Sequence, residues 1–122
     1  MVYYYSVKLQ PKKVEKNWGH ELWLANDEPN NYCGKILHVK SGHSFSMHFH
    51  SKKHETFYIL SGKCRLKTLD TQTAAEIEEE LYEGDCYIIN KLVPHQITAI
   101  TDCDIIESST FHEDSDSYRV WR

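Results

Sequence analysis

The chain has 122 residues and a formal net charge of −4 at pH 7, which argues against a nucleic-acid-binding or anionic-membrane surface. Its length is typical of one domain that buries a hydrophobic core without help from disulfides. No apolar run approaches the roughly 20 residues that a membrane-spanning helix needs.

Two features of the sequence bear on the compartment. Residues 1–6 contain neither a basic nor an apolar segment of the signal-peptide kind, so we expect no signal peptide there. The four cysteines are widely spaced and form no Cys-x-x-Cys pair. Cys64 and Cys86 lie in apolar strand patterns, which favours buried free thiols. Together these features predict a reducing, cytoplasmic setting.

The first third of the chain predicts an arm followed by two strands. Residues 2–9 are compatible with a strand, in an arm that either caps the domain, pairs with a second subunit or stays a partly ordered tail. Residues 18–24 predict a packed strand, in which His20 is more simply structural than functional. Residues 25–31 are rich in turn formers, and residues 33–40 predict the next strand.

The stretch from residue 42 to 62 carries the chemistry. His48 and His50 are two apart, so on a strand their side chains point to the same face. Residues 51–54 are short and polar, as in a turn, and Glu55 then opens an aromatic and β-branched run that predicts a strand. A tight hairpin brings Glu55 beside the two imidazoles. Two imidazoles and a carboxylate on one interior face make a site for a divalent metal ion.

The second half of the chain continues with short strands. Residues 63–69 alternate, so we expect the three basic side chains to face water and the residues between them to face inward. Residues 76–82 are ambiguous, because glutamate favours helix; we predict strand over their second half, with the acidic run solvated or facing the preceding lysines. Further strands are predicted at 86–90, 96–101 and 104–108. This succession predicts an all-β, antiparallel barrel.

The spacing of the 42–62 stretch resembles the first sequence motif of the cupin superfamily. Its defined positions are Gly42, His48, His50, Glu55 and Gly62, and residues 84–95, ending in Val-Pro-His, resemble the second motif. The resemblance implies a single-domain jelly-roll barrel over residues 1–122, with an arm and first strands at 1–32, the barrel at 33–110 and a tail at 111–122. It also implies one divalent ion with four ligands, which are His48, His50, Glu55 and His95.

A second resemblance concerns the flanks of the barrel. The Trp18-Gly19 pair before it, the Gly34-Lys35-Ile36 segment and the tail from Glu107 to Arg119 are similar to cupins of the mannose-6-phosphate isomerase type. This similarity implies a sugar or sugar phosphate as ligand and aldose–ketose isomerisation as the reaction. Asn17 stands where proline is common in such proteins, and this chain has no nucleotide-transferase domain.

Isomerisation assigns roles to further residues. The metal ion holds the carbonyl and hydroxyl oxygens of the substrate while a base moves a proton between neighbouring carbons. Glu107, on the last predicted strand, and His54, next to a predicted ligand, are the candidate bases. Lys53 and Arg119 are candidate contacts for an anionic group.

Two other functional classes remain open at this point. The same four ligands suit Fe(II) in a dioxygenase, and a sugar-binding cupin without turnover is a third hypothesis. Imidazole and carboxylate ligands accept Mn, Fe, Co, Ni and Zn, so the sequence does not identify the metal. We also expect a homodimer, because Tyr3, Tyr4, Tyr5, Trp18 and Trp23 place aromatic side chains outside the core motifs.

Overall fold

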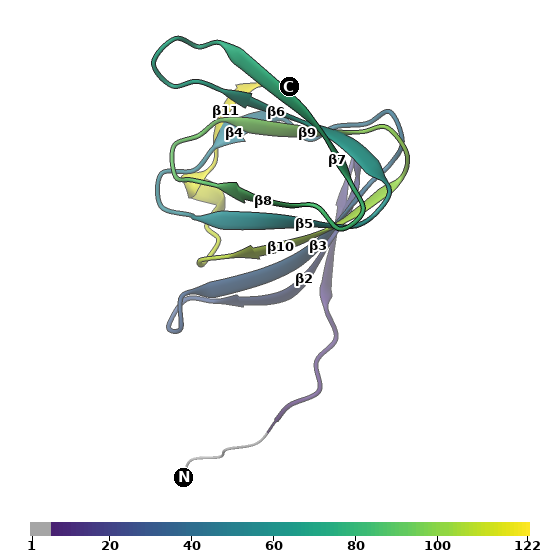
Figure 1. The fold of residues 1–122 in the computed structure, drawn as a ribbon. Helices are drawn as coiled ribbons and strands as arrows, with labels where there is room; N and C mark the ends of the chain where they lie inside the picture. The colour runs from purple at the N-terminus through teal and green to yellow at the C-terminus, as the bar shows by residue number, and fades with distance from the viewer. Residues whose placement is uncertain (1–5) are drawn as a thin grey trace.

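The computed structural model describes residues 6–122, which form antiparallel strands and one short 3-10 turn (Figure 1). The strands are β1 (Lys12–Lys16), β2 (Gly19–Asp27), β3 (Tyr32–Val39), β4 (Met47–Phe49), β5 (Glu55–Ser61), β6 (Lys63–Leu69), β7 (Glu76–Tyr82), β8 (Cys86–Ile89), β9 (His95–Ala99), β10 (Cys103–Ser109) and β11 (Tyr118–Trp121). The 3-10 turn η1 (Asp114–Asp116) precedes β11. Within residues 6–122 there is no helix with the length and apolar character needed to cross a membrane.

The strands form two sheets that enclose one interior. One sheet has the order β1-β2-β3-β10-β5-β8 and the other the order β11-β4-β9-β6-β7, and all pairings are antiparallel. Figure 1 shows the two sheets facing each other, with β5 and β8 below β9 and β4. The predicted fold, a small jelly-roll barrel of antiparallel strands, is confirmed.

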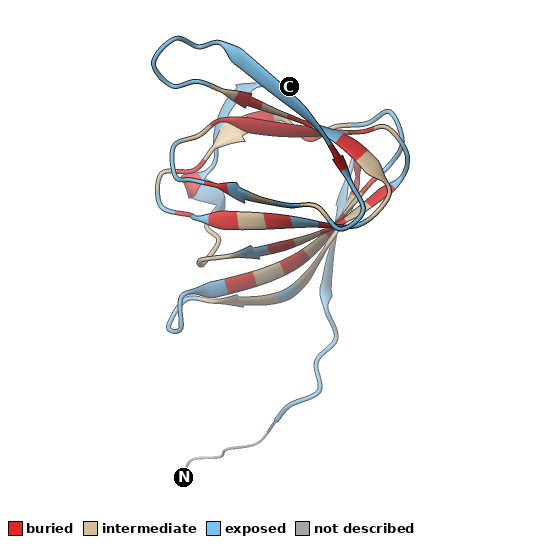
Figure 2. Cartoon of the chain, in the orientation of Figure 1, coloured by how far each residue is buried: buried red, intermediate tan, exposed pale blue. Residues whose placement is uncertain are grey.

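One half of the interior is apolar. In the larger sheet, Ile105 of β10 lies between Leu37 of β3 and Ile59 of β5, and Cys103 pairs with Val39. None of these five side chains is more than 4% exposed. Figure 2 shows the alternation that produces this packing, with buried bands separated by exposed ones along the strands. We call this region the apolar half; it comprises Leu37, Val39, Ile59, Ile97, Cys103 and Ile105.

The other half of the interior is polar, and the same strands build it. Two residues beyond Ile105 on β10, the inward position is Glu107, which pairs in register with Lys35 of β3. On the facing sheet, β9 begins with His95 and continues inward with Ile97. We call this region the polar half; it comprises Lys35, His50, Lys53, Glu55, His95 and Glu107, none of them more than 5% exposed.

Steric constraints explain why the residue that closes the histidine-containing stretch, Gly62, is a glycine. Gly62, between β5 and β6, has φ of +90°, and a Cβ there would lie 2.2 Å from the carbonyl oxygen of Asp102. A side chain is therefore excluded by both the backbone angle and the close approach. This turn fixes β5, and with it the position of Glu55, against the rest of the barrel.

The acidic segment is a strand along its whole length, 76–82, rather than only over its second half. Its glutamates face basic residues of β6, in the pairs Lys63–Glu80, Arg65–Glu78 and Lys67–Glu76. Cross-strand pairing of opposite charges outweighs the helix preference of glutamate here. The expected alternation of β6 and the expected lysine-facing acidic run are both confirmed.

Three expectations for individual segments are wrong. The N-terminal strand begins at Lys12, because residues 12–16 pair with β2, whereas residues 6–11 form no strand; residues 2–5 of the predicted strand lie outside the described residues. Strand β2 continues to Asp27, through part of the predicted turn. Cys86 is exposed rather than buried, because it occupies an outward position of β8.

Candidate metal centre and cavity

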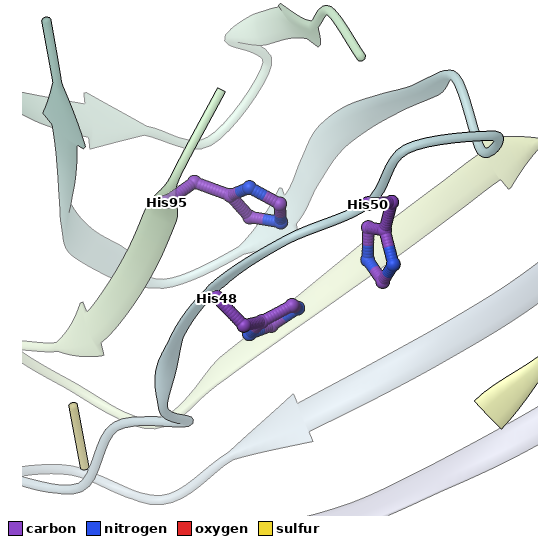
Figure 3. Close-up of side chains that lie close together, drawn as sticks. All are labelled: His48, His50 and His95. Atoms are coloured by element: carbon purple, nitrogen blue, oxygen red, sulfur yellow. The ribbon is translucent and has the colours of Figure 1, made fainter. Parts of the chain in front are cut away.

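Three histidines converge inside the barrel from two strands. His48 lies on β4, His50 directly follows that strand, and His95 begins β9, where it pairs in register with His48. A potential ligand atom from each residue lies within 4.8 Å of those of the other two. Figure 3 shows the three rings grouped around one point. The predicted same-face placement of His48 and His50 therefore brings both beside His95.

Hydrogen bonds orient the three rings in the same way. The Nδ1 atom of His48 lies 2.7 Å from the carbonyl oxygen of Ser46, and that of His95 lies 2.9 Å from the carbonyl oxygen of Val93. The Nδ1 atom of His50 lies 2.9 Å from the carbonyl oxygen of Asp116. A carbonyl only accepts, so each Nδ1 carries the proton and each Nε2 keeps a free lone pair. Such backbone partners are typical of metal-ligating histidines.

Glu55 completes the arrangement. Its Oε1 atom lies 2.8 Å from Nε2 of His95 and 3.7 Å from Nε2 of His50. Neither Glu55 Oε1 nor His95 Nε2 has a hydrogen-bond partner of acceptable geometry within residues 6–122, and both atoms are buried. Two lone pairs that face each other in a buried site repel one another unless a cation lies between them. A divalent ion bound by these atoms satisfies both, so the residues fit a metal site.

Burial also prepares the imidazoles for ligation. Desolvation lowers the pKa of His48 to about 3, with a further contribution from neighbouring His95. Desolvation likewise lowers the pKa of His50. For the Glu55 carboxyl, burial acts to raise the pKa, but neighbouring positive charge, including that of Lys53, outweighs burial and holds the pKa below its usual range. Neutral imidazoles and an ionised carboxylate are the forms that bind a metal ion.

A buried lysine lies behind the carboxylate. The Nζ atom of Lys53 is 2.5 Å from Glu107 Oε2, 3.4 Å from Glu55 Oε2 and 3.1 Å from Nδ1 of His112. The three protons of this ammonium group are thus matched by three partners. Burial acts to lower the pKa of Lys53, but Glu107 and Glu55 outweigh burial and raise it. Lys53 is consequently a charged support of the site, and its contact with an anionic ligand stays a prediction.

The polar half opens into a cavity of about 440 Å³, a volume within the range of small-molecule sites. Its wall includes His48, His50, Glu55 and Glu107, together with the aromatic side chains of Trp18, Trp23, Phe45 and Phe57. Arg119 also lines the cavity. Trp18 belongs both to the cavity wall and to the core, where it packs edge-on against Phe45. A metal ion at the histidines is therefore accessible to a ligand in the cavity.

The remaining candidate base lies elsewhere. His54 is exposed, and its Nε2 atom is 3.1 Å from Oδ1 of Asn90. It lines a separate shallow depression with Asn90 and Lys91. The turn that follows His50 points this side chain outward, so the structure does not bring His54 to the cavity, and the sequence-based hypothesis that it is a base is not carried further.

The C-terminal tail supplies residues that sequence patterns did not indicate. The Asp116 carboxylate accepts hydrogen bonds from the backbone N–H groups of Ser51, Lys52 and Lys53, and from the Ser51 hydroxyl. It therefore holds the turn between His50 and Glu55. Next to this turn, His112 accepts from Lys53. A short acidic tail gives no periodic signal, so only the unusual density of Asp and Ser at 114–117 marks it.

Comparisons with known proteins agree with this fold. Residues 35–107, more than half of the chain, match the family described as "Cupin domain". No curated protein matches the chain. Among solved structures, the capsular polysaccharide assembling protein CapF from Staphylococcus aureus superposes with a TM-score of 0.81 at 18% identity, over 94% of this chain and 35% of that chain.

Oxalate decarboxylase from Bacillus subtilis superposes with a TM-score of 0.80 at 15% identity, over 96% of this chain and 33% of that chain. The chain thus spans about a third of the length of these structures, and at such identity the likeness concerns the fold. The family match and the barrel with its histidine cluster lead to one assignment: the chain belongs to the cupin domain family.

Proposed function

We propose that the protein is a metal-dependent cupin that binds a sugar or sugar phosphate and interconverts its aldose and ketose forms. The observation that carries the proposal is the unsatisfied contact between Glu55 Oε1 and His95 Nε2, beside two further histidines and below a polar cavity. His48, His50, His95 and Glu55 would hold one divalent ion. When bound, that ion polarises the carbonyl and adjacent hydroxyl oxygens of the substrate.

The base in this proposal is Glu107. Its Oε2 atom is held by Lys53 and by the Ser109 hydroxyl, which lies 3.2 Å away, so Oε1 is the oxygen available to accept a proton. Glu107 removes the proton from the carbon next to the carbonyl and returns it to the former carbonyl carbon, while a hydroxyl proton moves to the other oxygen. No electrons leave the substrate, so the reaction needs no oxidant. The ion pair with Lys53 holds the Glu107 side chain in place beside the cavity.

The test is a panel of hexoses, pentoses and their phosphates, incubated with metal-loaded protein in deuterium oxide. We expect metal-dependent isomerisation of at least one member, with solvent deuterium beside the carbonyl unless the site shields the transferred proton. Glu107→Gln should retain the metal and lose at least about a hundredfold in rate, as for loss of a general base. An equally active Glu107→Gln variant would remove Glu107 from the mechanism.

Two outcomes would replace isomerisation by another function. Oxygen consumption by the iron-loaded protein on some other substrate, with no isomer formed from any panel sugar, would favour the dioxygenase hypothesis. Saturable binding of a sugar without any product would favour a binding protein. Metal analysis of untagged protein, purified without chelator, separates these cases further, because oxygen-sensitive iron is the metal that a dioxygenase needs.

We also propose that the protein forms a homodimer. The aromatic residues behind this expectation do not all support it, since Trp18 is buried, Trp23 lines the cavity, and Tyr3 to Tyr5 lie outside the described residues. Support comes instead from the outer face of the larger sheet, where Ile36, Ile106 and Tyr58 stand in register on neighbouring strands. Light scattering should give twice the chain mass of 14.4 kDa; a monomer at micromolar concentration would contradict this.

A cytoplasmic location is likewise a proposal. Cys33, Cys64 and Cys103 are buried free thiols, and Cys86 is an exposed one. Free thiols persist in reducing compartments. Mass spectrometry after alkylation of native and unfolded protein should count four reduced cysteines; a disulfide in protein from its native cell would contradict the proposal.

A further inference from the structure

We propose that the mouth of the cavity is an anion-binding site for the phosphate group of a phosphorylated ligand, formed by Lys12 and Lys16 of β1 and Arg119 of β11. This inference rests on the proposed function and narrows its ligand from sugars in general to phosphorylated ones.

The charge of the cavity is opposite in sign to that of the chain. Six basic and four acidic side chains line it, although the chain as a whole carries a net charge of −4. The basic ones are Lys12, Lys16, Lys35, Lys53, Arg119 and Arg122, and the acidic ones are Glu21, Glu55, Glu107 and Asp114. A divalent ion at the histidines would make the cavity more positive still. Such a concave positive surface attracts anionic ligands.

The acidic side chains of the cavity are already engaged. Glu21 lies 3.5 Å from Lys35 and accepts a hydrogen bond from the Trp23 ring nitrogen. Glu55 and Glu107 contact Lys53, as described above. Asp114 lies 2.9 Å from Nε2 of His112, whose hydrogen bond is the chief cause of the lowered pKa of Asp114.

The basic side chains at the mouth are not engaged in this way. Lys12, Lys16, Arg119 and Arg122 form no ion pair with any residue in the range 6–122. All four residues are exposed, whereas Lys35, Lys53 and the carboxylates of the floor are buried. The positive charge that remains for a ligand therefore lies at the entrance, above the metal centre.

Strand register directs these side chains inward. On β1, Lys12, Val14 and Lys16 alternate with Lys13 and Glu15, and only the first three line the cavity. On β11, Arg119 pairs in register with His48, and directly opposite residues share a face of the sheet. Arg119 thus stands beside a candidate metal ligand, on the side of the cavity.

The two strands reach the same mouth from the edges of different sheets. β1 is an edge of the six-stranded sheet and β11 an edge of the five-stranded one. Lys16 also contributes to lowering the pKa of Asp114 in the tail, which agrees with its lying on the tail's side of the cavity. Lysine charges together with an arginine fork suit the tetrahedral oxygens of phosphate. A ligand held by the metal through its carbonyl end would then place a terminal phosphate at the mouth.

The experiment measures binding by calorimetry, first of inorganic phosphate and then of a hexose 6-phosphate against the same hexose. Each titration is done with metal-loaded and with chelator-treated protein, because phosphate can also bind the metal directly. We expect the hexose phosphate to bind at least about tenfold more tightly than the hexose, as for a charge-assisted contact. Phosphate binding should persist without metal and weaken at high salt.

The variants locate the site. Arg119→Gln and the double variant Lys12→Gln/Lys16→Gln should each weaken phosphate binding by roughly tenfold. Lys13→Gln is the matched control: it removes the same charge from the same strand, but its side chain pairs with Glu15 on the opposite face. It should change the affinity by less than about twofold. Equal affinities in all three variants and the wild type would overturn the proposal.

The outcomes separate this inference from the proposed function. Tight, Arg119-dependent binding of hexose phosphate without product would leave the anion site standing and remove the isomerase. Turnover of a sugar phosphate, with a KM unchanged in the Lys12→Gln/Lys16→Gln and Arg119→Gln variants, would leave the isomerase standing and remove the anion site.

Discussion

The two halves of the barrel interior are built from the same strands but serve opposite purposes. On β10, Cys103 and Ile105 point into the apolar half, and Glu107, the next inward residue, points into the polar half. β3 makes the same change between Leu37 and Lys35. The apolar half stabilises the fold by removing hydrocarbon from water. The polar half does the reverse, because it buries charges whose desolvation their mutual attraction offsets only in part.

This difference indicates that the polar half serves to bind a ligand rather than to stabilise the fold. A barrel of this size could be filled by apolar side chains, as in its other half. Instead, the polar half holds Lys53 between the carboxylates of Glu55 and Glu107. It also holds the Glu55 carboxylate against the unprotonated Nε2 atom of His95. Such an arrangement needs each partner in place, and the predictions below disturb one half or the other.

The largest effect on stability is expected for Lys53→Met. Removing this charge leaves Glu55 and Glu107 buried without compensation, which should lower the free energy of unfolding by about 3–5 kcal/mol. Denaturant unfolding without added metal measures it. Lys52→Met is the matched control, because Lys52 is exposed and its pair with Glu113 should contribute less than about 1 kcal/mol. Equal effects of the two variants would contradict the described role of Lys53.

Next in size is Asp116→Asn. The asparagine keeps the shape of the side chain but loses the negative charge that accepts three backbone N–H groups of the 51–53 turn. We expect a loss of about 1–3 kcal/mol in unfolding free energy, with weaker metal binding because the turn joins His50 to Glu55. Asp114→Asn, in the same 3-10 turn, has a side chain that is 93% exposed and should cost less than about 1 kcal/mol. The prediction is wrong if Asp116→Asn is the milder change.

In the apolar half, Ile105→Val should cost about 0.5–1.5 kcal/mol through the loss of one buried methylene. Its neighbour Ile106 points to the outer face, and Ile106→Val should stay within about 0.5 kcal/mol of the wild type. Thermal unfolding compares the two. Both variants should bind metal as the wild type does; a metal defect in Ile105→Val would show that the two halves are not independent.

The smallest effect is expected on the outer surface of the barrel. Glu78 lies 4.0 Å from Arg65, and both side chains are about half exposed. Glu78→Gln should lower stability by only about 0.2–1 kcal/mol, and 1 M salt should abolish the difference. An effect that is larger, or that persists in salt, would mean that the pairs between β6 and β7 stabilise the barrel as much as buried contacts do.

Sequence alone predicted the parts of this protein that follow a local period. The inward and outward sides of β6, and the common face of His48 and His50, follow from alternation within a few residues. Strand β11 in the tail escaped prediction because its partner is β4, some 70 positions earlier in the chain, and no local pattern reports such a pairing. The role of Lys53 escaped it for a similar reason. Its partners Glu107 and His112 come from distant segments of the chain. The local sequence shows only a lysine in a polar turn, which is the usual pattern of a solvent-exposed lysine.

The measurement that tests the account most directly is the metal content of untagged protein and of four variants. The wild type should carry close to one divalent ion per chain, since one buried cluster provides the ligands. His50→Ala, His95→Ala and Glu55→Gln should each lose most of it, because each removes one of the four protein ligands of the ion. His43 is exposed, and its ring nitrogen contacts the carbonyl oxygen of Ser41 rather than any residue of the cluster. The His43→Ala variant should therefore retain the ion. Near-stoichiometric metal in both His50→Ala and His95→Ala would contradict the account.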